Sequence, residues 1–153
     1  MARSSSADLD ALADVVTRLR RALRRLVRSD LPFDTPMAQI EVMQLLADRP
    51  GLRAGEVGEA LTIAPTTVST LVGALLAHDL IDRRADPDDR RAWQLYLTPA
   101  GRQQLADWQQ SNRRVLRDAA SALDLADLRA LRDAVPALTK LVTRLDAGRG
   151  DDS

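Results

Sequence analysis

The spacing of the apolar residues constrains the fold of this 153-residue chain more than any other feature. Over most of the chain, leucine, valine and isoleucine recur every three or four residues, which is the spacing of one face of an α-helix. At residues 93–97 the spacing changes, because Trp93, Leu95 and Leu97 alternate with more polar residues, as in a half-buried β-strand. A second short segment, 80–84, precedes it. The sequence therefore predicts a mainly helical protein with one β-hairpin, whose return strand is anchored in the core by these three side chains.

The helical segments follow one another in a definite order. Thr98 and Pro99 supply a cap and a first helical residue, and Thr35 and Pro36 do the same for an earlier helix. Pro136 lies inside the last helix, where we expect a kink or a break. The predicted order is a long helix at 8–29, a helix from Pro36 to about Pro50, short helices at 53–60 and 65–78, the hairpin, and long helices at 99–122 and 125–146.

The three long helices have apolar stripes that the rest of the chain is too small to cover. Stripes of this kind at both ends of a chain suggest burial against a second copy. We therefore predict that residues 1–34 and 99–147 are dimerisation helices around a compact middle region, 35–98. The last residues, 148–153, are polar and glycine-containing, which predicts a disordered tail.

Composition excludes several classes of function. The chain has no cysteine and one histidine, so thiol chemistry and a histidine-rich metal site are excluded, and we expect neither a cofactor nor an enzyme. No apolar run approaches the length of a membrane span, and no signal peptide is evident at the N-terminus, so we expect a soluble cytoplasmic protein. Residues 53–102 hold six arginines and seven acidic residues, a local charge of −1. Any DNA contact there depends on individually placed arginines and not on a basic field.

The helix at 65–78 has an unusual outward face. Its apolar face is opposed by small, uncharged residues, where a solvated helix normally carries charge. Two interpretations remain open: the face packs beneath another element, or it is the second helix of a helix-turn-helix and enters the DNA major groove. On the second interpretation, hydroxyls contact bases or phosphates. The small residues are Thr66, Thr70, Gly73, Ala74 and Ala77, with Thr67 and Ser69 beside them, and the predicted DNA-binding residues of this helix are Thr66, Thr67, Ser69 and Thr70.

The turn of the hairpin, DPDDRRA at 86–92, concentrates charge. Beside a recognition helix such a hairpin is a wing, and we interpret Arg90 and Arg91 as residues that enter a DNA minor groove. Asp89 is predicted to brace the wing by holding Arg91 in one rotamer through a charge-assisted hydrogen bond. A solvated charged turn and a hard-cation site at the three aspartates are the alternatives, although the further ligands of a calcium loop are missing.

Three stretches of this sequence resemble the MarR (multiple antibiotic resistance regulator) family. Residues 86–92 followed by LTPAG at 97–101 resemble the family's wing signature. The stretch PTTVSTLV at 65–72 resembles its recognition helix, and LIDR at 80–83 its first wing strand. The order of the helices matches over nearly the whole chain, and the resemblance implies a winged helix-turn-helix fold with N- and C-terminal dimerisation helices.

The resemblance also implies a function. It implies a homodimeric transcriptional regulator, usually a repressor, that binds a pseudo-palindromic operator in double-stranded DNA. It further implies release by a small, often aromatic or phenolic, effector lodged between the dimerisation and DNA-binding parts. Met37, Met43 and Trp108 are candidate walls of such a pocket. No membrane partner is expected.

The sequence departs from the family's pattern at two places. Ala64 stands where members often have a capping serine, and Thr70 and Ala74 stand where members often carry arginine. These departures shift the expected affinity towards the wing and the dimer. A dimeric helical adaptor that has lost DNA binding is the alternative function, favoured by the near-neutral charge and disfavoured by the wing arginines.

Overall fold

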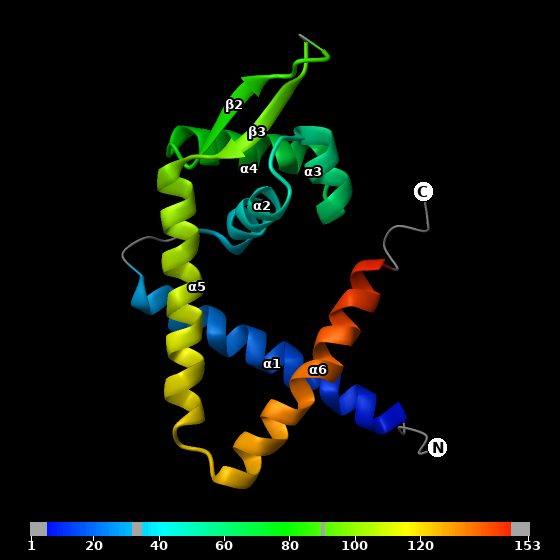
Figure 1. Cartoon of the computed structure of the whole chain (residues 1–153), viewed down its shortest axis with the longest axis vertical. Helices are drawn as coiled ribbons and strands as arrows, with labels where there is room; N and C mark the ends of the chain where they lie inside the picture. The colour runs from blue at the N-terminus through cyan, green and yellow to red at the C-terminus, as the bar shows by residue number, and fades with distance from the viewer. Residues whose placement is uncertain (1–5, 32–34, 90, 148–153) are drawn as a thin grey trace. The chain divides into compact units, whose positions relative to one another are not determined.

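The structure, a computed structural model, describes residues 6–31, 35–89 and 91–147 (Figure 1). Within these residues the chain is mainly helical with a small antiparallel sheet, as the sequence predicted. The elements are α1 (Ser6–Asp30), α2 (Met37–Asp48), β1 (Leu52–Arg53), α3 (Ala54–Leu61), α4 (Pro65–Ala77), β2 (Ile81–Ala85), β3 (Trp93–Leu97), α5 (Pro99–Ala120) and α6 (Leu125–Ala147).

The chain divides into two compact units, residues 1–113 and 114–153. The hydrophobic core of the first unit lies between α2, α3, α4 and one face of the sheet. Each element contributes to the core the apolar residues that recur at helical or strand spacing in the sequence, because residues at that spacing share one face of the element. The largest fully buried side chains are Ile40, Met43, Leu46, Leu75, Ile81 and Leu95.

The sheet has three strands in the order β1-β3-β2, all antiparallel. The sequence did not predict β1, whose two residues pair with Leu95 and Gln94 of β3. Leu95 and Leu97 are buried as expected, but Trp93 is 52% exposed, so the expectation that it anchors the core is wrong. Trp93 pairs with Ala85 at the turn end of the hairpin, whereas the buried leucines lie further from the turn.

The two Thr-Pro pairs behave differently. The hydroxyl of Thr98 accepts the N–H of Gly101 at 2.9 Å and donates to the carbonyl of Asp79 at 2.7 Å, so this threonine starts α5 as predicted. In contrast, Pro36 is the N-cap of α2, and no side chain caps that helix. The Thr35 hydroxyl instead accepts the side-chain amide of Gln104 at 2.6 Å.

Glycine is required where α5 meets the hairpin. A Cβ at Gly101 would overlap the carbonyl oxygen of Leu80. The first turn of α5 therefore lies directly against the backbone that leads into β2, and this contact fixes where the hairpin begins.

The second unit consists of the end of α5 and α6. Helix α6 runs without a break through Pro136, so of the predicted kink or break, the break does not occur. Large apolar side chains are exposed along it: Leu125, Leu131, Val135, Leu138, Leu141, Val142 and Leu145. No single helix in the described residues is long and apolar enough to cross a membrane; α3 and α4 meet the length and composition test only as a bent pair.

Candidate nucleic-acid interface

Helices α3 and α4 form the helix-turn-helix. Their axes are bent by 116°, within the range of about 90–120° that is usual for this motif. The link turns at Thr62, whose φ of 56° is left-handed, and Ile63 donates its N–H to the carbonyl of Gly58 at 3.0 Å. A Cβ at Gly58 would lie 3.1 Å from a methyl of Val68, so the two helices approach closely.

Burial of one face positions α4 and leaves the other face free. Val68, Val72 and Leu75 are buried in the core, which turns the small-residue face of the helix outwards. Thr66, Thr67, Ser69 and Thr70 are all exposed, and no described element covers them. Of the two interpretations of this face, packing beneath another element of the chain does not occur within the described residues.

Two of these hydroxyls are already hydrogen-bonded within the helix. Ser69 donates to the carbonyl of Pro65 and Thr70 to that of Thr66, each at 3.0 Å. A hydroxyl whose hydrogen is held in this way presents its lone pairs outwards. In this state the face offers acceptors, which suit the amino groups of adenine and cytosine in the major groove.

Helix α4 begins without a side-chain cap. Its N-cap is Ala64, with φ −63° and ψ 146°, and Pro65 follows at the first helical position. Alanine has no side-chain acceptor, so the absence of a side-chain cap on α4 is the consequence expected from Ala64.

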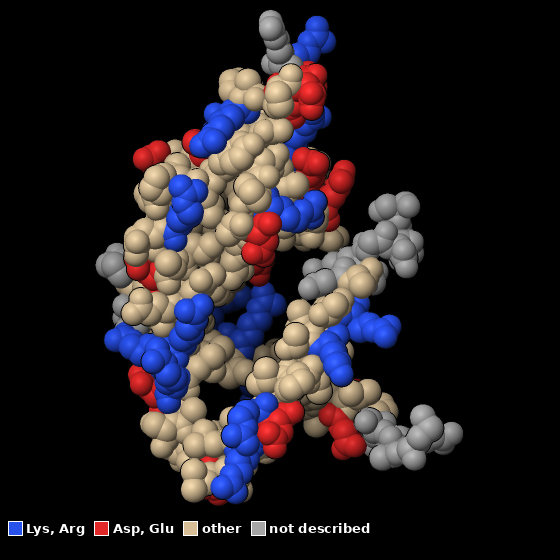
Figure 2. Space-filling model, viewed as in Figure 1, with Lys and Arg blue, Asp and Glu red and all other residues tan. Residues whose placement is uncertain are grey.

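We use the term wing for residues 81–97, which comprise β2, β3 and the turn between them. In Figure 1 the hairpin extends beyond α4 at the top of the view. Arg83, Arg84 and Arg91 are exposed on it. Arg90 lies outside the described residues. Acidic and basic side chains lie side by side over this part of the molecule in Figure 2, as expected from the local charge.

The side chain of Asp89 is hydrogen-bonded to the backbone of Arg91. Its Oδ1 accepts the backbone N–H of Arg91 at 3.0 Å, which shapes the end of the turn. The sequence predicts a bond to the guanidinium of Arg91 instead. The Arg91 side chain is exposed, so it is available to another molecule.

The residue that braces the wing most extensively is Asp86, whose partners sequence reasoning missed. Asp86 is only 4% exposed. Its Oδ1 accepts the N–H groups of Asp88 at 2.9 Å and Asp89 at 3.3 Å. Its Oδ2 accepts Nε and Nη2 of Arg53 at 2.9 and 2.7 Å, and the Gln94 amide at 3.3 Å. The local half of this pattern is an Asx turn, which an Asp before proline signals; the partners from β1 and β3 carry no sequence signal.

These contacts change the ionisation of both partners. The N–H of Asp88, followed by the Arg53 guanidinium, holds the pKa of Asp86 below its ordinary value of 3.8. The hydrogen bond to Asp86 raises the pKa of Arg53. Both groups are therefore charged at neutral pH, and both oxygens of Asp86 accept hydrogen bonds from protein donors.

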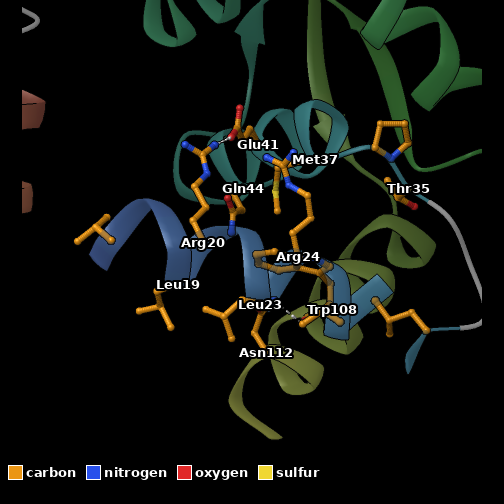
Figure 3. A pocket seen from close by; sticks show the side chains of 14 residues that line it. Leu19, Arg20, Leu23, Arg24, Thr35, Met37, Glu41, Gln44, Trp108 and Asn112 are labelled. Carbon is orange, nitrogen blue, oxygen red and sulfur yellow. Dashed lines mark hydrogen bonds and ion pairs between the residues drawn. The ribbon is translucent and has the colours of Figure 1, made fainter. Parts of the chain in front are cut away.

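A cavity of about 540 Å³ lies in the first unit between α1, α2 and α5 (Figure 3). Met37 and Trp108, two of the predicted pocket residues, line it; Met43 does not, because it is fully buried in the core. Arg20 and Arg24 point from α1 towards α2, where Arg20 pairs with Glu41 at 3.0 Å. The wall is completed mainly by apolar side chains, including Val16, Leu19, Leu23, Val27 and Leu31.

Comparisons with known proteins agree with this geometry. Residues 36–93, from the residue before α2 to the first residue of β3, match the MarR family. A Thauera aromatica protein assigned as the transcriptional regulatory protein for the hcr operon is 31% identical over 86 residues, which is 56% of this chain and 52% of that protein. The chain thus spans about half the length of this relative.

Solved structures share the fold. The transcriptional regulator Tm0710 of Thermotoga maritima is 24% identical with a TM-score of 0.68, over 90% of this chain and 95% of that one. A MarR family protein of Bacillus stearothermophilus is 19% identical with a TM-score of 0.73, over 94% of this chain and 99% of that one.

The bent helix pair and its hairpin define the class: this is a winged helix-turn-helix protein. Residues 36–93 match the MarR family of transcriptional regulators, and the chain shares the fold of solved structures of that kind. The match of residues 36–93 is to a family of transcriptional regulators, which is in line with the prediction that the chain is not an enzyme.

Proposed function

We propose that this chain is a cytoplasmic homodimer that binds a pseudo-palindromic operator in double-stranded DNA and represses transcription until a small effector releases it. The observation that carries the DNA-binding proposal is the pairing of an exposed, uncharged face on α4 with a braced wing that carries exposed arginines. The small side chains on α4 allow close approach to the major groove, and the wing arginines suit the negative potential of a minor groove.

The contacts divide between the two parts. We assign base and phosphate contacts in the major groove to Thr66, Thr67, Ser69 and Thr70, all exposed on α4. We assign the minor-groove contact to Arg91, with its neighbour Arg90 as predicted from the sequence. This division gives α4 the larger share of sequence discrimination and the wing the larger share of electrostatic affinity.

Exposed apolar surface supports a homodimer through the terminal helices. Leu9, Val15, Val16 and Leu19 of α1 are each about half exposed, at 57, 57, 49 and 48%. On α6, Leu125 is 72% exposed and Leu145 62%. Such continuous apolar stripes are stabilised by burial, and a second copy supplies a matching surface by symmetry. A dimer also provides two copies of α4 for two half-sites about one helical turn apart.

The cavity between α1, α2 and α5 supports the effector part of the proposal. Its volume suits a small organic ligand, and its lining combines apolar side chains with Trp108 and two arginines. We propose that a small aromatic or phenolic effector binds there, with Met37 and Trp108 against its ring. Because α1 is one of the proposed dimerisation helices, a ligand in this cavity can change how the two copies of α4 are spaced.

The test begins with selection of bound fragments from fragmented genomic DNA, followed by titration of a selected fragment with the full chain. We expect saturable binding that weakens with salt, and light scattering at twice 16.8 kDa. A strict monomer at micromolar concentration contradicts the dimer. Absence of DNA binding even at low salt contradicts the regulator and favours the adaptor alternative.

A further inference from the structure

We propose that Arg53 is a positioning residue for the DNA interface: through Asp86 it fastens the wing turn to the helix-turn-helix, so that Arg91 and α4 meet DNA in a fixed relation. This inference rests on the proposed DNA binding. It concerns the residue that sets the geometry and not a residue that reads the DNA.

The backbone of Arg53 is fixed where two elements join. Arg53 ends β1 and immediately precedes α3, the first helix of the helix-turn-helix. It pairs with Gln94 of β3, and its N–H donates to the carboxylate of Glu56 in the first turn of α3 at 2.6 Å. The side chain of Arg53 therefore projects from a fixed backbone. Any group bonded to it is held in a fixed position relative to the N-terminus of α3.

The group that it holds is the centre of the wing turn. The Asp86 carboxylate receives the Arg53 guanidinium on one oxygen and two backbone N–H groups of the turn on the other. Because Asp86 is 4% exposed, water cannot replace a lost partner without rearrangement of the turn. The ion pair thus joins residues 33 positions apart in the chain at the point where the turn begins.

Further hydrogen bonds within the turn extend this anchorage to Arg91. The N–H of Asp86 donates to the carbonyl of Ala92 at 3.1 Å, and the N–H of Ala92 donates to the carbonyl of Asp89 at 2.9 Å. Asp89 in turn accepts the N–H of Arg91. The backbone N–H of Arg91 and the backbone of Ala92 are therefore tied to the part of the turn that Asp86 and Arg53 hold.

A parallel set of contacts on the same face of the sheet supports the role. Gln94 donates to Asp86 and accepts the hydroxyl of Tyr96 at 2.7 Å. The ring of Tyr96 lies under the guanidinium of Arg84, 4.4 Å from its carbon to the ring centroid. The anchorage therefore reaches β2 and β3 as well as the turn.

Two other roles for Arg53 make different predictions. Its side chain is 44% exposed, so it could bind a phosphate directly. In that case removal of Asp86 would leave affinity unchanged or increase it, because a negative charge is lost from a surface that faces DNA. If the pair only stabilises the fold, its loss would lower the unfolding midpoint while the folded protein kept its affinity and the contribution of Arg91.

The decisive variant is Asp86→Asn, and Asp88→Asn is its matched control. Both remove one negative charge from the same turn, but the side chain of Asp88 is exposed and serves the turn through its backbone N–H. We expect Asp86→Asn to weaken binding of a genomically selected fragment about tenfold and to lower the salt slope by about one, as if a wing contact were lost. Asp88→Asn should leave affinity unchanged or slightly higher.

Arg53 is tested by Arg53→Lys and Arg53→Gln. Arg53→Gln should weaken binding about as much as Asp86→Asn, and Arg53→Lys, which keeps the charge, should restore part of the loss. When Arg91→Ala is combined with Arg53→Gln or with Asp86→Asn, it should reduce DNA affinity much less than it does in the native chain, because the contact of Arg91 with DNA is already displaced. Circular dichroism before each titration establishes that the compared variants are folded.

Several outcomes overturn the inference. The inference fails if the Asp86→Asn variant binds DNA as tightly as the Asp88→Asn variant. It also fails if the losses of binding free energy caused by Arg53→Gln and Arg91→Ala are fully additive in the double variant. If Asp86→Asn does not fold, the comparison of Arg53→Gln with Arg53→Lys and the Arg91 cycle still decide. A native chain that binds no selected fragment instead contradicts the proposed function itself, so the two failures are distinguishable.

Discussion

The recognition helix and the wing reach the same proposed surface by opposite physical means. Helix α4 is positioned by apolar burial of Val68, Val72 and Leu75, and its outer face carries no charge. The wing turn has no apolar anchor of its own and is positioned by hydrogen bonds that converge on one buried carboxylate, Asp86. The helix is therefore insensitive to the loss of any one polar contact, whereas the wing depends on one.

This contrast matters for how the two parts contribute to binding. An uncharged helix face discriminates by shape and hydrogen bonding but gains little from counterion release. A wing arginine contributes in the opposite way. Substitutions in the wing should thus alter the affinity for DNA and its salt dependence. Substitutions on α4 should alter how closely the helix fits the major groove and which DNA sequences are preferred.

The largest effect should come from Arg91→Ala. We expect affinity for the selected fragment to fall by about tenfold or more and the salt slope to fall by about one, because one cation leaves the interface. Fluorescence anisotropy at four or five salt concentrations measures both quantities. Arg132→Ala, which removes the same charge from the exposed surface of α6, is the control. Equal slopes for both variants would contradict the wing's role.

The same contrast explains what could be predicted from the sequence. Periodicity identified α4, β3 and the buried leucines because a core selects one face of each element. Thr98 was predictable as a cap because capping is local. Tertiary context decided otherwise at Thr35, whose hydroxyl bonds Gln104, 69 residues away. Helix α6 continues through Pro136 without the break that the local rule allowed.

The wing was harder to predict for a physical reason. Its acidic residues were recognisable as turn formers, but which of them is buried depends on Arg53, 33 residues earlier. Strand β1 has two residues and no measurable period, so nothing in the sequence placed Arg53 beside the turn. Polar anchorage over long sequence separations leaves no repeating pattern, and apolar packing does.

A smaller effect is expected from Gly73→Ala on α4, which should raise the stability of the protein and lower its affinity for DNA. Among the described residues, nothing beyond the adjacent backbone of α4 lies within 4 Å of a Cβ at Gly73, so alanine should stabilise the helix by about 0.5–1 kcal/mol. The added methyl lies on the small-residue face and should weaken DNA binding severalfold by blocking close approach. Thermal unfolding and anisotropy measure the two changes.

Gly55→Ala on α3 is the matched control, because Gly55 is exposed and a Cβ there also meets no described residue beyond the adjacent backbone of α3 within 4 Å. It should be neutral or stabilising without any loss of affinity. If Gly73→Ala binds DNA as well as the native chain, α4 does not approach the groove as closely as proposed, and the contrast with the wing would weaken.

The smallest effect should be a difference in acid response between the two regions. Asp86 has a folded pKa below its ordinary 3.8, so its ionised form is favoured by folding. Its contribution to stability is present above the unfolded pKa and is lost as pH falls through the lower folded pKa. The amide resonances of Asp88 and Asp89, which donate to Asp86, should therefore titrate with a midpoint below 3.8, while those of Val68 and Val72 on α4 should not follow it. Asp86→Asn should abolish this titration and leave the α4 amides unchanged. A midpoint at or above 3.8 would show that the carboxylate is not held as the ion-paired wing requires, and the two regions would then be positioned by more similar means than their contacts indicate.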